Sequence, residues 1–145
     1  KEINVMPTNQ LDLEETYYQK QPVEIPPPPS GKTLNKPLGE LFGARSGDKG
    51  GCANIGVWAK SENAFSFLNN FLAVEKIKQL MPDISEFEID RYELPNILSL
   101  NFYIHDILED GVSSNNRKDG QAKSLGEYLR AKYADIPESL FEENI

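Results

Sequence analysis

The sequence has few of the residues that bind metals or form disulfides. Among its 145 residues it has one cysteine, Cys52, and one histidine, His105. A single cysteine excludes a disulfide within the chain and is typical of a reducing compartment. A zinc site needs three or four ligands from cysteine, histidine or carboxylate side chains, so this composition argues against one. We expect neither a metal nor a cofactor.

Long apolar runs and basic stripes are also missing. No stretch approaches the roughly 20 apolar residues that a membrane-spanning helix needs, and the N-terminal residues lack a signal-peptide pattern. The net charge is −8, and no row of lysines or arginines offers a surface to a nucleic-acid backbone. We therefore expect a soluble, cytoplasmic protein that binds neither membranes nor nucleic acids.

The first part of the chain is rich in proline and has weak periodicity. Residues 1–36 include the run from Pro26 to Pro29, which favours an extended polyproline II conformation. Such a composition is typical of a linker between domains, or of an arm that packs along a neighbour. We predict that residues 1–36 have one of these two roles.

From residue 37 the hydrophobic pattern indicates regular secondary structure. Ser61 or Asn63 can cap a helix whose apolar residues recur at helical spacing, and two asparagines in its middle leave open a break into two helices. Strands are indicated where apolar and polar residues alternate. The predicted elements are strands at 37–44 and 53–59, a helix at 61–82, strands at 86–94 and 99–108, and a helix at 119–134.

The order of these elements predicts the fold class. Two pairs of strands, each followed by a helix, are most simply arranged as an α+β sandwich. We predict a ferredoxin-like two-layer fold, in which a four-stranded, mainly antiparallel sheet has two helices on one face. Leu100, Phe102 and Ile104 should face the core, and His105 the other side.

The segment FGARSGDKGGCANIGVWAK, residues 42–60, is the first candidate site. Glycines at this density cost conformational entropy, so something must require them. A glycine-rich hairpin tip can direct consecutive backbone N–H groups at an anion, and Arg45 and Lys49 would add positive charge. The alternative is a salt-bridged tip in which Asp48 neutralises both cations. The segment is not a P-loop, because a strand follows it in place of a helix.

A second polar cluster, NNRKDGQAKS at residues 115–124, precedes the last predicted helix. The free N–H groups at a helix N-terminus attract anions, and Arg117 and Lys123 lie close by in the sequence. Ordinary capping of the helix, with Asp119 accepting from its free N–H groups, is the alternative.

The remaining reactive side chains give weaker signals. His105 lies on the outer face of its strand, where a lone histidine is usually a surface residue. Cys52 is better explained as a small buried thiol than as a nucleophile, because no second histidine offers a base. Trp58 alternates with core-facing residues and is a candidate for covering a second interface.

Three motifs together resemble a known family. ARSGDKGGCANIGVWAK, RYELPNILSLNF and RKDGQAKSLGEYL, in this order and spacing, are similar to the ferredoxin-fold domain of acyclic terpene utilisation protein AtuA and its relatives. The resemblance spans residues 37–141 and implies a linker or arm at 1–36 and an acidic tail at 142–145. The sequence departs from the family at Gly51-Cys52 and at Ala122, where a glycine is common; Ala122 tests whether that turn needs a positive φ.

The resemblance also implies the site residues and the setting. The candidate ligand-binding or interface residues are Arg45, Ser46, Asp48, Lys49, Asn54, Asn101, Arg117, Asp119, Gln121 and Lys123. The family implies a role in branched acyl-CoA or terpenoid catabolism. It implies as partners an acyl-CoA or other anionic small molecule, and a larger AtuA N-terminal-type domain or an acyl-CoA carboxylase subunit. We expect a homo-oligomer.

Two functions remain open at this point. The composition favours a binding and assembly module, because it offers no metal cluster and no paired carboxylates at a recognised spacing. The alternative is a hydratase or lyase for acyl-CoA, with Asp48 as general acid or base and Arg45 and Lys49 as the clamp. Two nearby cations would lower the pKa of Asp48, which argues against proton donation near neutral pH.

Overall fold

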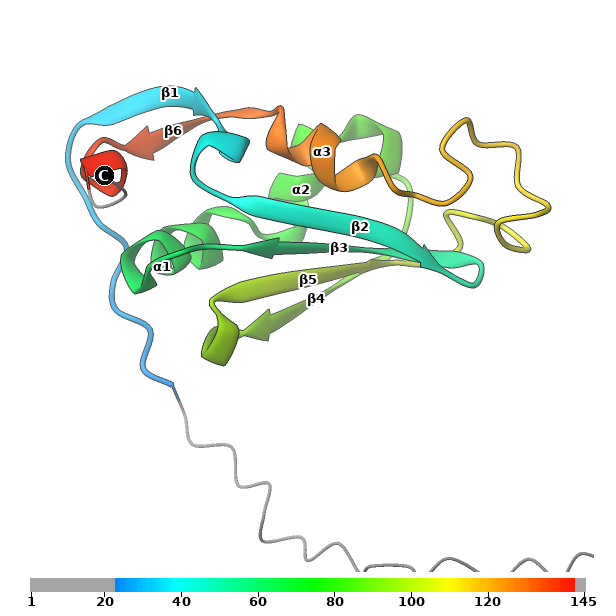
Figure 1. Cartoon of the computed structure of the whole chain (residues 1–145), viewed down its shortest axis with the longest axis horizontal. Helices are drawn as coiled ribbons and strands as arrows, with labels where there is room; N and C mark the ends of the chain where they lie inside the picture. Colours follow the sequence, from blue (N-terminus) through cyan, green and yellow to red (C-terminus); the bar gives the residue numbers. More distant parts are fainter. Residues whose placement is uncertain (1–22, 143–145) are drawn as a thin grey trace, which may run out of the picture.

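The computed structural model describes residues 23–142, and its centre is a four-stranded sheet (Figure 1). The strand order is β2-β3-β5-β4, and every neighbouring pair is antiparallel. The strands are β2 (Gly43–Lys49), β3 (Cys52–Trp58), β4 (Ile89–Leu94) and β5 (Ser99–Ile104). The predicted α+β class and four-stranded sheet are confirmed.

Helices cover one face of this sheet. They are α1 (Glu62–Phe71), α2 (Val74–Leu80) and α3 (Leu125–Arg130), and their buried side chains share one core with the sheet. The predicted helix at 61–82 is thus two helices, because the backbone leaves helical geometry at Leu72 and Ala73. Of the two predicted caps, Ser61 is the one the structure shows, since its hydroxyl accepts a hydrogen bond from the Ala64 N–H at 3.2 Å.

The alternation predicted for the strands holds. Ile55 lies opposite Phe102 in neighbouring strands, and both are fully buried, as are Leu100 and Ile104. Burying each such side chain stabilises the fold by about 1.5–3 kcal/mol. Residues at the alternate positions lie on the other face of the sheet, which none of α1, α2 and α3 covers. We call this second surface the open face.

A second, two-stranded sheet was not predicted. It pairs β1 (Thr33–Pro37) with β6 (Tyr133–Pro137), and Leu34 lies opposite Ile136. The predicted boundary between residues 36 and 37 therefore falls inside a strand. The last helix was also predicted too long, because it ends at Arg130 and the chain then extends into β6. Pairing between segments about 100 residues apart leaves no local pattern in either of them.

Two other predicted segments differ from the structure. Residues 37–44 are not one strand, because the helical turn η2 (Leu38–Glu40) separates β1 from β2. Part of the predicted linker packs on the domain: Ile25 contacts the core, and the Ser66 hydroxyl donates a hydrogen bond to the Pro26 carbonyl. Residues 1–22 and 143–145 lie outside the described residues, and Glu142 ends the short helix α4 (Ser139–Glu142).

Candidate functional site

The predicted glycine-rich tip is mostly β-strand. Lys49 pairs with Cys52, so only Gly50 and Gly51 connect β2 to β3. Gly50 has φ +67°, as the first residue of a tight hairpin turn requires. The predicted strands at 37–44 and 53–59 implied a hairpin tip longer than two residues, and that prediction is wrong. The backbone of residues 43–49 pairs with β3 and does not form a turn of converging N–H groups.

The protein's own packing requires two of these glycines. A Cβ atom on Gly51 would lie 2.2 Å from the Glu109 carbonyl oxygen. A Cβ atom on Gly43 would lie 2.2 Å from the indole ring of Trp58, which lies over that glycine on the open face. Trp58 therefore covers Gly43, and 38% of the surface of Trp58 remains exposed to solvent. Close approach within the chain explains these two glycines without a ligand.

Strand alternation separates the charged residues of β2. Arg45 lies opposite Gly56 and belongs to the open face, whereas Asp48 lies opposite Ala53, whose side chain is in the core. Asp48 forms a long ion pair with Lys123, at 3.8 Å between Nζ and Oδ1. Among residues 23–142, no carboxylate forms an ion pair with Arg45, so the predicted neutralisation of both cations by Asp48 is not found.

Lys49, Asn54 and Asn101 occupy the open face beside Arg45. The Lys49 ammonium donates a hydrogen bond to the Asp48 backbone carbonyl at 2.9 Å. Asn54 and Asn101 lie on adjacent strands, and the Asn54 amide donates to the Asn101 side-chain oxygen at 2.9 Å. The two asparagines named by the family motifs thus form one half-buried pair on the sheet.

The second predicted cluster forms the turn that leads into α3 (Leu125–Arg130). One carboxylate oxygen of Asp119 accepts from the Lys123 N–H at 2.9 Å, and the other accepts from the Ser124 N–H at 2.8 Å and hydroxyl at 2.6 Å. Burial raises the pKa of Asp119, but these hydrogen bonds and nearby Arg117 outweigh it and lower the pKa below its usual value. Asp119 therefore closes the turn before α3, and its carboxylate accepts from N–H groups that precede the helix.

The backbone before α3 explains the departure at residue 122. Ala122 has φ +53° and is 1% exposed. This turn does need a left-handed residue, which is why glycine suits it. Gln121, next to it, is exposed to solvent.

The two candidate sites predicted from the sequence, at residues 42–60 and 115–124, meet where α3 packs on β2. The Ser46 hydroxyl accepts a hydrogen bond from the Gly126 N–H at 2.9 Å. A Cβ atom on Gly126 would lie only 3.1 Å from the Arg45 backbone, so glycine permits this close approach. A pocket of about 300 Å³ opens at this contact. Its lining residues are Ala44, Arg45, Ser46, Lys123, Gly126 and Glu127.

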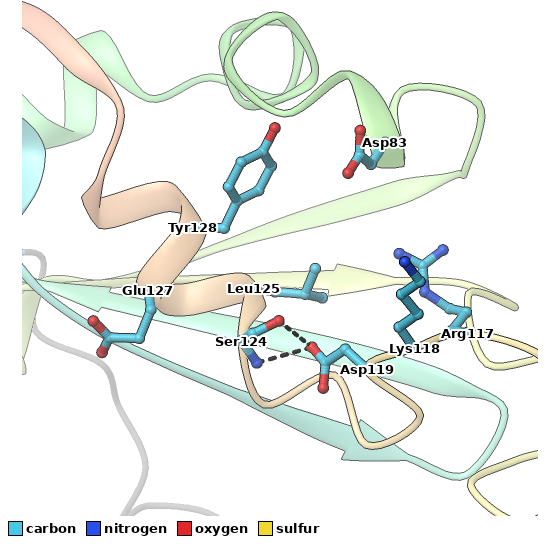
Figure 2. Close-up of a pocket in the computed structure, with 8 residues that line it drawn as sticks. All are labelled: Asp83, Arg117, Lys118, Asp119, Ser124, Leu125, Glu127 and Tyr128. Atoms are coloured by element: carbon cyan, nitrogen blue, oxygen red, sulfur yellow. Dashed lines mark hydrogen bonds between the residues drawn. The ribbon is translucent and has the colours of Figure 1, made fainter.

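A larger pocket of about 800 Å³ adjoins α3 (Figure 2). Figure 2 shows Arg117 and Lys118 side by side on the loop before α3, with Asp83 above them and the Tyr128 ring rising from α3. Asp83 comes from the helical turn η3 (Pro82–Ile84). The lining residues are Asp83, Arg117, Lys118, Asp119, Ser124, Leu125, Glu127 and Tyr128.

The two pockets share Glu127, so they flank the first turn of α3. Sequence reasoning found Arg45, Lys123 and Arg117 but missed Lys118 and Asp83. The adjacent Arg117-Lys118 pair was a usable signal, whereas Asp83 is brought in by the tertiary fold alone.

His105 is not an isolated surface residue, which corrects the prediction. Its Nε2 lies 2.9 Å from Oδ2 of Asp90 on the adjacent strand β4. That hydrogen bond raises the pKa of His105. Burial acts to lower the pKa, and the negative charges of Asp90, Glu88 and Asp106 raise it further. The same contact lowers the pKa of Asp90.

Cys52 lies beside this pair and is half-buried. Its sulfur accepts a hydrogen bond from the Asp106 N–H at 3.4 Å, and its hydrogen bond with Tyr103 raises the pKa of the phenol.

Comparison with protein families identifies the domain. Residues 36–134 match the AtuA ferredoxin-like domain family. The chain belongs to this family. The family match and the four-stranded antiparallel sheet together establish the ferredoxin-like fold. No curated protein and no solved structure matches the chain. Within residues 23–142, no helix has the length and apolar character that crossing a membrane would require.

Proposed function

We propose that this AtuA ferredoxin-like domain is a binding and assembly module of branched acyl-CoA or acyclic terpene catabolism. It recognises an anionic group through β2 and the start of α3. That group belongs to an acyl-CoA or another small anion, or to a partner such as a larger AtuA N-terminal-type domain or a carboxylase subunit. The family supports the metabolic setting, and the residues support the chemistry.

The arrangement of Arg45 and Lys123 carries this proposal. Both line the pocket of about 300 Å³ beside α3, at the edge of the sheet formed by β2. The Lys123 side chain reaches the same face of β2 as Arg45, because a Cβ atom on Gly47 would lie 2.9 Å from its Nζ. Among the described residues Arg45 has no ion-pair partner, and the Lys123 contact with Asp48 is long at 3.8 Å. A guanidinium fork and an ammonium group that keep donors available can grip a carboxylate or phosphate. A ligand can displace Asp48 from Lys123 at little cost, because exposed ion pairs contribute little to stability.

The larger neighbouring pocket suits a ligand that has both a charged and an apolar part. Arg117 and Lys118 offer two more cations within it, and the aromatic ring of Tyr128 and the side chain of Leu125 offer apolar surface. Asp83 and Glu127 lie in the same pocket and would repel a ligand that is anionic throughout. A molecule with an anionic head and a less polar remainder suits this combination best.

The hydratase or lyase alternative has less support. It requires Asp48 to act between Arg45 and Lys49. Strand alternation places Arg45 opposite Gly56 and Asp48 opposite Ala53, on different faces of the sheet. Asp48 also lines neither of the two pockets beside α3, whereas Arg45 lines the smaller one.

Isothermal titration of the full chain with an acyl-CoA tests whether the anionic group belongs to a small ligand. The chain should bind, and Arg45→Ala or Lys123→Ala should each weaken binding by about 10–100-fold, because each removes a charge-assisted hydrogen bond. Lys60→Ala is the matched control. Lys60 is an exposed lysine just after β3 that lines neither pocket, so its removal should leave affinity unchanged.

Co-purification with the same variants tests whether the anionic group belongs to a partner protein. The tagged chain should retain a partner in an extract of its source cells, and Arg45→Ala should lose it while Lys60→Ala keeps it. If neither acyl-CoA binding nor a retained partner depends on Arg45, the proposal is wrong. Hydration of an unsaturated branched acyl-CoA by the chain, abolished by Asp48→Asn, would favour the enzymatic alternative.

A further inference from the structure

The open face carries the histidine of this chain beside two carboxylates. Ile89 of β4 pairs with Ile104 of β5, so the next residues, Glu88 and His105, also lie opposite each other. The His105 N–H donates to the Glu88 carbonyl at 3.0 Å, which fixes this register. Asp90 lies two residues along the same strand and therefore on the same face as Glu88.

The side chains of these three residues converge. One ligand atom from each of Glu88, Asp90 and His105 lies within 4.8 Å of the other two. The closest pair is His105 Nε2 and Asp90 Oδ2, at 2.9 Å. The Tyr103 ring packs edge-on against the His105 ring, with centroids 5.0 Å apart, and restricts its orientation.

The closest of these separations is near that of two ligands on one metal ion. An ion bound at about 2.1 Å holds neighbouring ligand atoms about 3 Å apart in an octahedral site and about 3.4 Å apart in a tetrahedral one. The His105–Asp90 distance is close to these values, and rotation of the exposed Glu88 side chain would bring its carboxylate closer than the present limit of 4.8 Å. The backbone of both strands can stay where it is.

We propose that Glu88, Asp90 and His105 bind a divalent transition-metal ion on the open face. One imidazole nitrogen and two carboxylate oxygens suit ions such as Zn²⁺, Mn²⁺ or Fe²⁺, whereas Mg²⁺ and Ca²⁺ prefer oxygen ligands alone. Three protein ligands leave coordination positions open to water or to a ligand from solution. All three side chains are accessible, so the ion can enter without opening the fold.

This site is separate from the anion pocket. None of its three residues lines either pocket beside α3. Low counts of cysteine and histidine argue against a zinc site when ligands are counted by residue type. The pairing of β4 with β5 places two carboxylates beside the histidine, and together they supply the three ligands that a metal site needs.

Titration of the metal-free full chain with Zn²⁺ tests the site. Isothermal titration should give a saturable single-site curve, and His105→Gln or Asp90→Asn should each weaken binding by at least about tenfold, since losing even an outer partner of a ligand costs that much. Glu86→Gln removes an exposed carboxylate two residues before the site and should leave Zn²⁺ affinity unchanged. Far-UV circular dichroism of each variant checks that the fold is kept.

Cys52 needs its own control, because its sulfur contacts the backbone of Asp106 beside His105. Cys52→Ser should retain Zn²⁺ binding, and the Co²⁺ form of the wild type should show visible d–d bands without a thiolate charge-transfer band. The Arg45→Ala variant should also bind Zn²⁺ normally, which separates this site from the proposed anion pocket. Absence of saturable Zn²⁺ binding, binding unchanged in both His105→Gln and Asp90→Asn, or binding lost in Cys52→Ser would each overturn the proposal.

Discussion

The Ser46 hydroxyl on β2 accepts a hydrogen bond from the Gly126 N–H in α3 at 2.9 Å, across 80 residues of sequence. The first N–H groups of a helix have no partner within the helix. Ser46 therefore satisfies one of these groups from a neighbouring strand, whereas Asp119 accepts from the Lys123 and Ser124 N–H groups of the turn before the helix. This hydrogen bond ties the strand that carries Arg45 to the helix that both pockets adjoin.

Ser46→Ala should destabilise the protein by about 1 kcal/mol, because it leaves the Gly126 N–H without a partner in a half-buried position. The midpoint of urea unfolding should fall with an unchanged slope. Ser113→Ala is the matched control: Ser113 is exposed in the loop after β5, and its removal should change stability by less than about 0.5 kcal/mol. Equal effects of the two substitutions would show that the Ser46–Gly126 contact does not stabilise the fold.

Gly51→Ala should destabilise the protein by about 2–3 kcal/mol, because its Cβ atom would lie 2.2 Å from the Glu109 carbonyl oxygen and the backbone would have to move. Gly56→Ala provides the comparison. Its Cβ atom would only approach the Arg45 carbonyl oxygen at 3.8 Å, an ordinary contact. Alanine in a strand interior is favoured over glycine, so Gly56→Ala should be neutral or stabilising by up to about 1 kcal/mol. Thermal unfolding of both variants checks the order, and a Gly51→Ala variant as stable as Gly56→Ala contradicts it.

Asp119→Asn should reduce stability near neutral pH by about 1 kcal/mol, because the charged carboxylate accepts three hydrogen bonds in the turn before α3. The pKa of Asp119 is lowered in the folded protein. Its charged form therefore stabilises the fold above the unfolded pKa of about 3.9, and this stabilisation is lost as the pH falls through the lower folded pKa. The difference between wild type and Asp119→Asn should shrink accordingly in acid.

Urea unfolding at pH 7 and at about pH 3 measures this dependence on Asp119. Asp110→Asn is the control, because Asp110 is an exposed aspartate in the same loop. Its substitution should have little effect on unfolding at either pH. A stability difference for Asp119→Asn that stays constant from pH 7 into acid would show that the charge of this carboxylate is not its cause.

The strands and their inward faces could be predicted because alternation is local. Ile55, Leu100, Phe102 and Ile104 recur at every second position, and a sheet with one buried face demands that pattern. A helix start at Ser61 or Asn63 was equally visible, since the residue type and the following apolar positions both lie within one helical turn. The pair β1 and β6 left no such trace, because each strand is stabilised mainly by the other and the two lie about 100 residues apart.

The candidate site was predicted less completely than the fold. Arg45 and Lys123 were recognised by residue type, but their common pocket depends on how α3 packs against β2. Asp48 and Arg45 were expected to act together, and strand alternation divides them between two faces. The sequence placed His105 on the outward face of its strand but did not relate it to Glu88 and Asp90, because strand register was needed to bring the three within ligand distance.

The sequence by itself determined the class of fold, the faces of the main strands and the identity of the charged residues, because these depend on spacing within single elements. The tertiary structure decided which charged residues meet. Register between β4 and β5, and the close approach that glycine at position 126 allows between α3 and β2, bring together side chains from distant parts of the chain. Packing between elements sets those distances, and no single segment contains that information.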